Sequence, residues 1–147
     1  MAKKKAEGKK EKKPKVVVAT GKRKSAIARA TIKEGSGKVL INKVPLDLYQ
    51  PQLLRLKIRE PLMLAGDLAK KVDIEVNIKG GGISGQTDAI RQAIAKGLVE
   101  FYGDEKLKHV FLEYDRSLLV FDPRRNEPHK PSRSKKGPRR HKQRSKR

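Results

Sequence analysis

The clearest pattern of hydrophobic and polar positions runs through residues 72–79, where every second residue is aliphatic. Alternation with a period of two is typical of a β-strand that buries one of its faces. The three glycines that follow, Gly80, Gly81 and Gly82, permit backbone angles that other residues rarely adopt. This stretch therefore predicts a half-buried strand that ends in a tight turn.

Beyond Gly85 the apolar residues recur at helical spacing and form a single stripe. The stripe consists of Ala89, Ile90, Ala93, Ile94, Gly97, Leu98 and Phe101. It predicts a helix that packs one side against a core. The polar residues expected to face outward are Arg91, Gln92, Lys96 and Glu100. We expect Gly82 and Gly85 to provide the unusual backbone angles or the close approach that the joint between strand and helix requires.

Two further strands are predicted upstream, over residues 16–20 and 25–32, with a cationic turn over residues 21–24 between them. One face of the second strand carries three alanines and Ile32. Side chains this small predict close packing, and the alanine-rich helix is the expected neighbour. A hairpin turn is indicated by the glycines of residues 35–37, followed by a returning strand over residues 38–42.

Helical spacing returns over residues 47–64 and ends at Gly66. The apolar residues expected to supply core here are Leu46, Tyr49, Leu53, Leu54, Leu56, Ile58, Leu62 and Leu64. Asp104 is predicted to cap a second helix over residues 105–112. A final apolar run over residues 118–121 is expected to close the core. These elements predict a single small α+β domain.

Charge divides the chain into three parts. Its 147 residues contain 38 Lys and Arg against 16 Asp and Glu, a net charge of +22. Residues 1–15 are Lys-rich and are expected to be disordered, residues 16–121 form the globular domain, and residues 122–147 form an extended basic tail with 12 basic and 2 acidic side chains. Such charge favours a polyanionic partner, because basic side chains release the counterions condensed on phosphates.

Within the globular domain, Lys22, Arg23 and Lys24 form a run of three cations, with Arg29 nearby on the adjoining strand. We interpret this cluster as a patch that faces phosphates, the alternative being a solvated turn. No basic amphipathic helix is predicted, so we expect no membrane partner. The tails contain no aromatic residue, so their contacts with nucleic acid are expected to be with phosphates.

No catalytic constellation can be assembled from the sequence. Asp73 and Glu75 lie on the polar face of their strand, and Ser84 has no candidate base nearby. The three histidines are isolated, so we expect no metal site, no cofactor, no small-molecule substrate and no enzymatic activity. One alternative is a small-molecule kinase that binds ATP at the glycine turn, although the dinucleotide and P-loop spacings are absent. Another is a free-standing basic RNA-binding protein or RNA chaperone.

Three motifs in register resemble the family of ribosomal protein S9 of the small subunit. The first is GKRKSAIARA over residues 21–30, and the second is GGGISGQ over residues 80–86, which leads into residues 89–91. The third is Asp-Arg at residues 115–116, followed by a basic tail that ends QRSKR at residues 143–147. Together they cover about residues 16–147, and residues 122–128 resemble the archaeal and eukaryotic branch.

The resemblance implies a non-enzymatic protein of the small-subunit head in the cytoplasm, which binds ribosomal RNA and neighbouring head proteins. It implies a sheet of about four strands with helices on one face and a left-handed crossover, which is a rare hand. It also implies that the extreme C-terminus approaches the anticodon arm of the P-site tRNA. Family tails often carry an aromatic near the end, whereas the last eleven residues here have none.

The residues expected to bind RNA are Lys22, Arg23, Lys24, Arg29, Gly81, Gly82, Gln86, Arg116, Arg124, Arg125, Arg133, Lys135, Lys136, Arg139, Arg140 and Lys142. The residues expected to lie nearest the tRNA are Arg144, Lys146 and Arg147.

Overall fold

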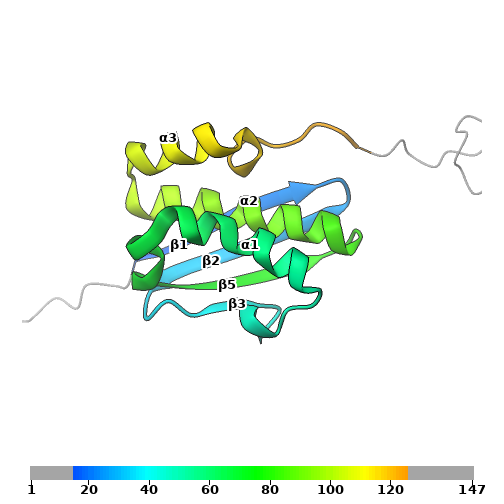
Figure 1. The fold of residues 1–147 in the computed structure, drawn as a ribbon, viewed down its shortest axis with the longest axis horizontal. Helices are drawn as coiled ribbons and strands as arrows, with labels where there is room; N and C mark the ends of the chain where they lie inside the picture. Colours follow the sequence, from blue (N-terminus) through cyan, green and yellow to red (C-terminus); the bar gives the residue numbers. More distant parts are fainter. Residues whose placement is uncertain (1–14, 126–147) are drawn as a thin grey trace, which may run out of the picture.

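Five strands form one mixed sheet in the computed structural model of the protein, which describes residues 15–125 (Figure 1). They are β1 (Val16–Arg23), β2 (Ala26–Glu34), β3 (Val39–Ile41), β4 (Val44–Pro45) and β5 (Val72–Lys79). Their order across the sheet is β1-β2-β5-β3-β4. Only β3 and β5 pair in parallel, and the other neighbours are antiparallel.

The helices cover one face of this sheet and leave the other open. They are α1 (Gln52–Ala65), α2 (Ile83–Tyr102) and α3 (Glu105–Tyr114), with short 3-10 turns η1 (Leu46–Leu48), η2 (Gly66–Lys71) and η3 (Arg116–Leu118). In Figure 1, α1 and α2 lie across the same side of the strands, and α3 packs against these two helices. The α+β class with helices on one face is therefore confirmed. The sheet has five strands rather than about four, the extra one being the two-residue β4. The handedness of the connection from β3 to β5 stays a prediction.

Helix α2 lies unusually close to β1 and β2. A Cβ placed on Gly21 in β1 would lie 2.0 Å from the Ala89 carbonyl oxygen, and one on Gly97 would lie 2.6 Å from Cδ1 of Ile32. The inward face of β2 consists of three fully buried alanines and Ile32, as the sequence predicts. Backbone and helix can approach this closely only because glycine and alanine line the contact.

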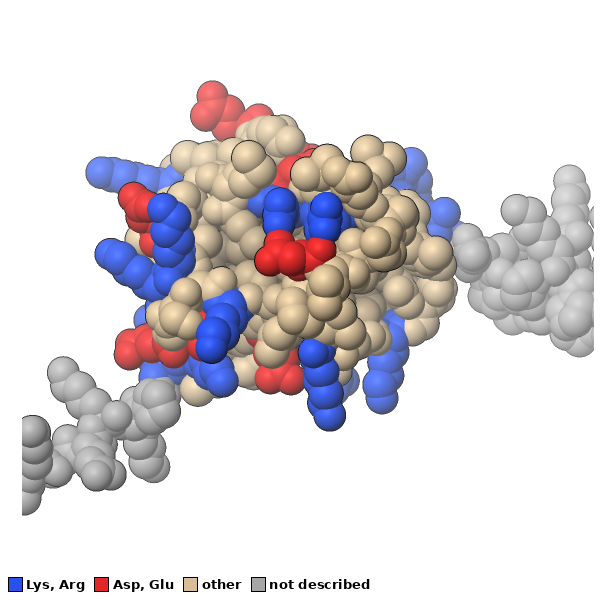
Figure 2. All heavy atoms as spheres, turned by 60° about the horizontal axis from the view of Figure 1, so that its bottom comes forward, with Lys and Arg blue, Asp and Glu red and all other residues tan. Residues whose placement is uncertain are grey.

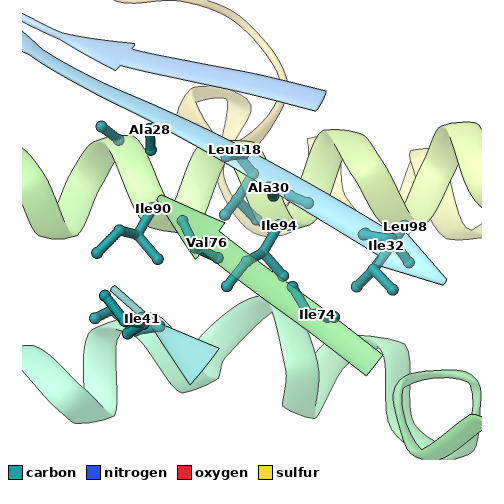
Figure 3. Close-up of a cluster of buried hydrophobic side chains, with 14 of the residues drawn as sticks. Ala28, Ala30, Ile32, Ile41, Ile74, Val76, Ile90, Ile94, Leu98 and Leu118 are labelled. Carbon is teal, nitrogen blue, oxygen red and sulfur yellow. The ribbon is translucent and has the colours of Figure 1, made fainter. Parts of the chain in front are cut away.

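The core lies between α2 and the sheet. Ile90, Ile94 and Leu98 of α2 point toward the aliphatic residues of β2 and β5 (Figure 3). Leu118 of η3 is fully buried and joins the same cluster. The predicted stripe of α2 and the alternation of β5 are confirmed, whereas the final apolar run closes the core only through Leu118 and Leu119, since Val120 is 40% exposed. Asp104 caps α3 as predicted, since its side chain accepts a hydrogen bond from the Lys106 N–H at 2.9 Å.

The predicted hairpin over residues 35–42 is wrong. The chain does turn at residues 35–37, but β3 then runs parallel to β5, which lies between β2 and β3. Asp73 of β5 holds the turn, because its carboxylate accepts hydrogen bonds from the N–H groups of Ser36 (2.8 Å) and Lys38 (3.0 Å). These two bonds lower the pKa of Asp73, the one from Lys38 most. A parallel pairing between distant segments leaves no local signal in the sequence.

Other predicted boundaries also differ, and α1 begins at Gln52, after the separate turn η1, rather than at residue 47. Strand β1 continues to Arg23, so the turn to β2 is made by Lys24 and Ser25 alone, with Lys24 at φ 52°. Because side chains alternate along a strand, Lys22 and Arg23 point to opposite faces of the sheet. Helix α2 begins at Ile83, so Gly85 lies inside its first turn rather than before it.

Several predicted exposures are wrong as well. Arg91 and Gln92 are 8% and 4% exposed, because α2 is covered by the sheet on one side and by α1 and η3 on another. The Gln92 side-chain oxygen accepts a hydrogen bond from the Lys22 N–H at 2.9 Å and so caps the free edge of β1. Leu53 and Leu56 are 76% and 50% exposed rather than core, since they lie on the outer side of α1.

Replacing Gly21 with Ala is expected to destabilise the protein, because the new methyl group would overlap backbone atoms of α2. The free energy of unfolding should fall by about 1–3 kcal/mol or more, the usual cost of overpacking. Urea denaturation of the RNA-free chain measures it. Gly85→Ala is the matched control, because its Cβ meets only ordinary contacts, the nearest at 3.7 Å. It should be neutral or stabilising by up to about 1 kcal/mol. Equal stability of the two variants would contradict the close packing.

Candidate nucleic-acid interface

Three cations gather on the open face of the sheet, away from the helices. Lys22 of β1 stands opposite Ile27 of β2, and Lys79 of β5 stands opposite the same Ile27 from the other side. Arg29 lies two residues further along β2 on this face, and all three cations are exposed. We call Lys22, Arg29 and Lys79 the sheet-face cations. The sequence predicts Lys22 and Arg29 but misses Lys79, which only the register of β5 against β2 brings to this place.

The turn between β1 and β2 (residues 24–25) and the glycine turn of residues 80–82 lie side by side, although they are 55 residues apart in the chain. They line a hollow of about 290 Å³, which we call the hairpin hollow. Its lining residues are Arg23, Lys24, Ser25, Gly81, Gly82, Ser84, Gly85 and Asp88. Two of the predicted motifs are thus brought together by the fold. The first backbone N–H groups of α2 have no partner within the helix and no side chain caps them, so this end of α2 favours anions.

The glycines that this turn requires are Gly80 and Gly81 rather than Gly82. Gly80 and Gly81 adopt φ of 75° and 73°, which other residues rarely adopt. A Cβ on Gly81 would also lie 2.8 Å from that of Ala26. Gly82 has φ of −92° and open space around it, so the expected demand on Gly82 and Gly85 is wrong. The Gln86 side-chain amide donates to the Gly80 carbonyl at 3.1 Å and closes the turn.

Arg23 is engaged by two carboxylates. Its side chain points to the helix side of the sheet and is 19% exposed. It pairs with Asp122, which follows η3, and its Nε lies 3.5 Å from Oδ2 of Asp88 in α2. Asp88 also pairs with Lys57 of α1 at 2.6 Å. In this structure Arg23 therefore ties the β1–β2 hairpin to α2 and to the start of the C-terminal segment.

Arg91 is the buried centre of a second ionic group. Its Nε lies 2.6 Å from a Glu60 oxygen of α1, and its Nη1 lies 2.9 Å from an Asp115 oxygen before η3. Burial raises the pKa of Asp115, but hydrogen bonds from Ser117 and Arg91 outweigh this and lower it. The carboxylate therefore stays charged opposite the buried guanidinium. The sequence gives no hint of this group, because its members come from three separate elements.

The C-terminal segment is anchored where it leaves the domain. Asp122 accepts hydrogen bonds from the Arg124 backbone N–H at 2.9 Å and from the Arg124 guanidinium at 2.7 Å. The Arg124 side chain, then its N–H, lower the pKa of Asp122 to about 2. Arg125 stacks over the Phe121 ring at 5.3 Å, and Arg116 is exposed on η3. These residues begin the basic tail.

The remaining predicted contacts fall on residues that the structure does not describe. They are Arg133, Lys135, Lys136, Arg139, Arg140 and Lys142 for RNA, and Arg144, Lys146 and Arg147 for tRNA. Within residues 15–125, no three metal-ligating side chains come together. No helix in that range combines the length and the apolar character needed to cross a membrane.

Comparisons of the sequence with a family model and with known proteins agree with one another. The family model described as "Ribosomal protein S9/S16" matches residues 21–147. The chain is 56% identical over 131 residues to the "Small ribosomal subunit protein uS9" of Methanococcus maripaludis, which covers 89% of this chain and 98% of that protein. The protein of the same name from Methanococcus vannielii is 54% identical over the same shares. Both relatives are archaeal, as the resemblance of residues 122–128 predicts.

Asp122 is expected to titrate about two units below an ordinary aspartate. Since its folded pKa of about 2 is depressed from 3.8, its contribution to stability is present above pH 4 and is lost only as the pH falls through about 2. Carbon-13 NMR of the Asp122 carboxyl group in the full chain measures this pKa. Arg124→Ala removes the largest cause and should raise it. A native midpoint near 4 would contradict the anchoring of the tail.

Proposed function

Because the chain belongs to the ribosomal protein S9/S16 family, we propose that it binds ribosomal RNA through the sheet-face cations and the hairpin hollow, and P-site tRNA through its last residues. Family membership makes the chain a structural component of the small ribosomal subunit in the cytoplasm and not an enzyme. The kinase-like and free-standing alternatives therefore fall away. Contact with other small-subunit proteins follows from the same membership. The location of the chain in the head of the subunit is part of our proposal.

The observation that carries the RNA proposal is the pairing state of the cations. In the described part of the chain, none of the three sheet-face cations forms an ion pair with a carboxylate. Their charges are therefore available to phosphates, and the open face beside them has no helix over it. Free cations on an exposed surface supply the salt-dependent affinity of nucleic-acid binding.

Lys24 and the start of α2 extend this surface around the end of the sheet. Lys24 is exposed at the hairpin and lines the hollow with the backbone of Gly81 and Gly82. Basic side chains beside free N–H groups suit the oxygen atoms of a phosphate. Asp88 lies in the same hollow, but Arg23 and Lys57 pair with it. We therefore assign direct phosphate contacts to Lys24 and the sheet-face cations, and an orienting role to Arg23.

Removing two sheet-face cations is expected to weaken the salt dependence of RNA binding. For Lys22→Ala with Lys79→Ala, the slope of log affinity against log salt should flatten by about 0.7–0.9 for each phosphate that the protein no longer neutralises. Filter binding of the full chain to small-subunit ribosomal RNA at several salt concentrations measures it. Lys106→Ala with Lys108→Ala removes two exposed lysines from α3 and is the matched control. Equal flattening in both variants would mean that charge alone matters and that the open face is not the interface.

The tRNA proposal concerns the last residues of the chain. The segment of residues 122–147 has 12 basic side chains, which can bind many phosphates of ribosomal RNA interchangeably. Removing one or two of these side chains should barely affect retention on the subunit. Residues at the end of the tail acquire a separate role only if they touch a second partner, as the family resemblance implies for Arg144, Lys146 and Arg147.

Deleting residues 145–147 is expected to leave assembly intact and to weaken P-site tRNA binding by about 1–3 kcal/mol, about 5- to 150-fold. The measurement is tRNA affinity of reconstituted small subunits at fixed magnesium and salt, with incorporation of the protein quantified. The control, Lys135→Ala with Lys136→Ala, also removes two positive charges but further from the end of the chain. Subunits that carry it should bind tRNA normally. If the deletion incorporates fully and binds tRNA as tightly as the native chain, the tail serves only as an anchor to ribosomal RNA.

A further inference from the structure

An apolar groove of about 650 Å³ opens beside α1, on the side of the molecule that carries β3. Its walls are β3 and the residues before it, the β4–η1 segment, and the last half of α1 with η2. The lining residues are Gly37, Lys38, Val39, Leu40, Pro45, Leu46, Asp47, Arg59, Leu62, Met63, Gly66, Ala69 and Lys70. We call this the α1 groove. It shares no residue with the hairpin hollow or with the sheet-face cations.

Large apolar side chains are exposed in and around the α1 groove. Met63 lines its edge and is 76% exposed. Leu48 follows the lining residues of η1 and is 68% exposed. A concave site with exposed apolar side chains at its edge is typical of a surface that a partner covers.

The charges at the groove rule out ribosomal RNA as the best occupant. Arg59 is already paired with Asp47, and Lys70 with Asp67 at 2.7 Å, although both of these pairs are exposed. Lys38 forms no ion pair within residues 15–125. An apolar floor offers phosphates little, whereas a protein side chain gains by burial there. Figure 2, in which the lower edge of Figure 1 comes forward, shows a largely neutral surface on which basic and acidic side chains meet near the centre and stand at several places along the edge.

The same charges decide what kind of protein fits. Of the three lining cations, Arg59 and Lys70 are paired with Asp47 and Asp67, and Lys38 keeps an unpaired charge within residues 15–125, so a partner with an acidic residue beside its apolar ones is complementary. The chain's own ends do not meet this condition. Residues 1–14 and 126–147 are both strongly basic and would be repelled by the rim. A second copy of the chain would meet the groove with the same excess of positive charge.

We propose that the α1 groove docks an apolar segment with acidic flanking residues from another protein of the small ribosomal subunit. This inference rests on the proposed function, because it places the chain inside the particle where such a neighbour exists. The segment inserts bulky apolar side chains between β3 and α1, while its acidic residues face Lys38 and the other cations of the rim. The open sheet face and the tails stay available to RNA.

The test places photoreactive benzoylphenylalanine at position 63 of the full chain, which is then assembled into small subunits and purified by sedimentation. Irradiation should attach the chain to one other subunit protein, at a segment that mass spectrometry shows to be apolar with Asp or Glu beside it. The matched control carries the reagent at position 53, which is equally exposed on α1 but outside the groove. It should not label that segment. A third chain, with the reagent at position 38 on the opposite wall, should label the same segment as position 63.

A synthetic peptide of the labelled segment then gives the affinity for the RNA-free chain by fluorescence anisotropy. Met63→Ser and Lys38→Glu should each weaken binding at least fivefold, and Leu53→Ser should leave it unchanged. Crosslinks to RNA, to a second copy of the chain, or to no protein from both groove positions would overturn the proposal. So would a labelled segment without acidic residues. Failure of the native chain to co-sediment with small subunits would instead contradict the proposed function itself.

Discussion

The close seat of α2 on β1 and β2 is the constraint from which the other features follow. Gly21 and Gly97 remove the side chains that would hold helix and sheet apart, and the alanines of β2 complete the contact. Because the helix lies so close, Gln92 reaches the backbone of β1. The start of α2 is thereby held beside the β1–β2 hairpin. The hollow between the β1–β2 hairpin and the glycine turn is thus a consequence of packing on the helix side of the sheet, opposite the sheet-face cations.

Covering α2 on two sides also explains the buried charge at its centre. Arg91 is only 8% exposed, so its charge needs carboxylates nearby, and Glu60 and Asp115 supply them from α1 and from the segment before η3. The Glu60 and Asp115 side chains are 29% and 34% exposed, so removing one of them should cost less than the ~3–5 kcal/mol typical of a fully buried pair, and the intact group adds little net stability. Its main effect is positional. It fixes η3, and with it the place where Asp122 meets Arg23 and the basic tail begins.

Sequence alone predicts those features that have a local period or a local chemical signal. The alternation of β5, the stripe of α2, the small face of β2 and the cap at Asp104 are all of this kind. Features set by distant partners were missed. Three such features are the parallel pairing of β3 with β5, the burial of Arg91, and the position of Lys79 across Ile27 from Lys22. Each depends on which strand or helix packs against the element. Three adjacent glycines likewise do not reveal that Gly81, and not Gly82, meets the neighbouring strand.

The proposed RNA interface follows from the pairing of the cations rather than from net charge. On the helix side of the sheet, Arg23, Lys57 and Arg91 each face carboxylates, so their charges hold elements of the domain together. On the open side, the sheet-face cations have no such partners in the described residues. A polyanion gains most where no internal carboxylate must first be displaced. The fold thus places the paired cations and the cations that we propose to bind RNA on opposite faces of one sheet, and the α1 groove lies apart from both.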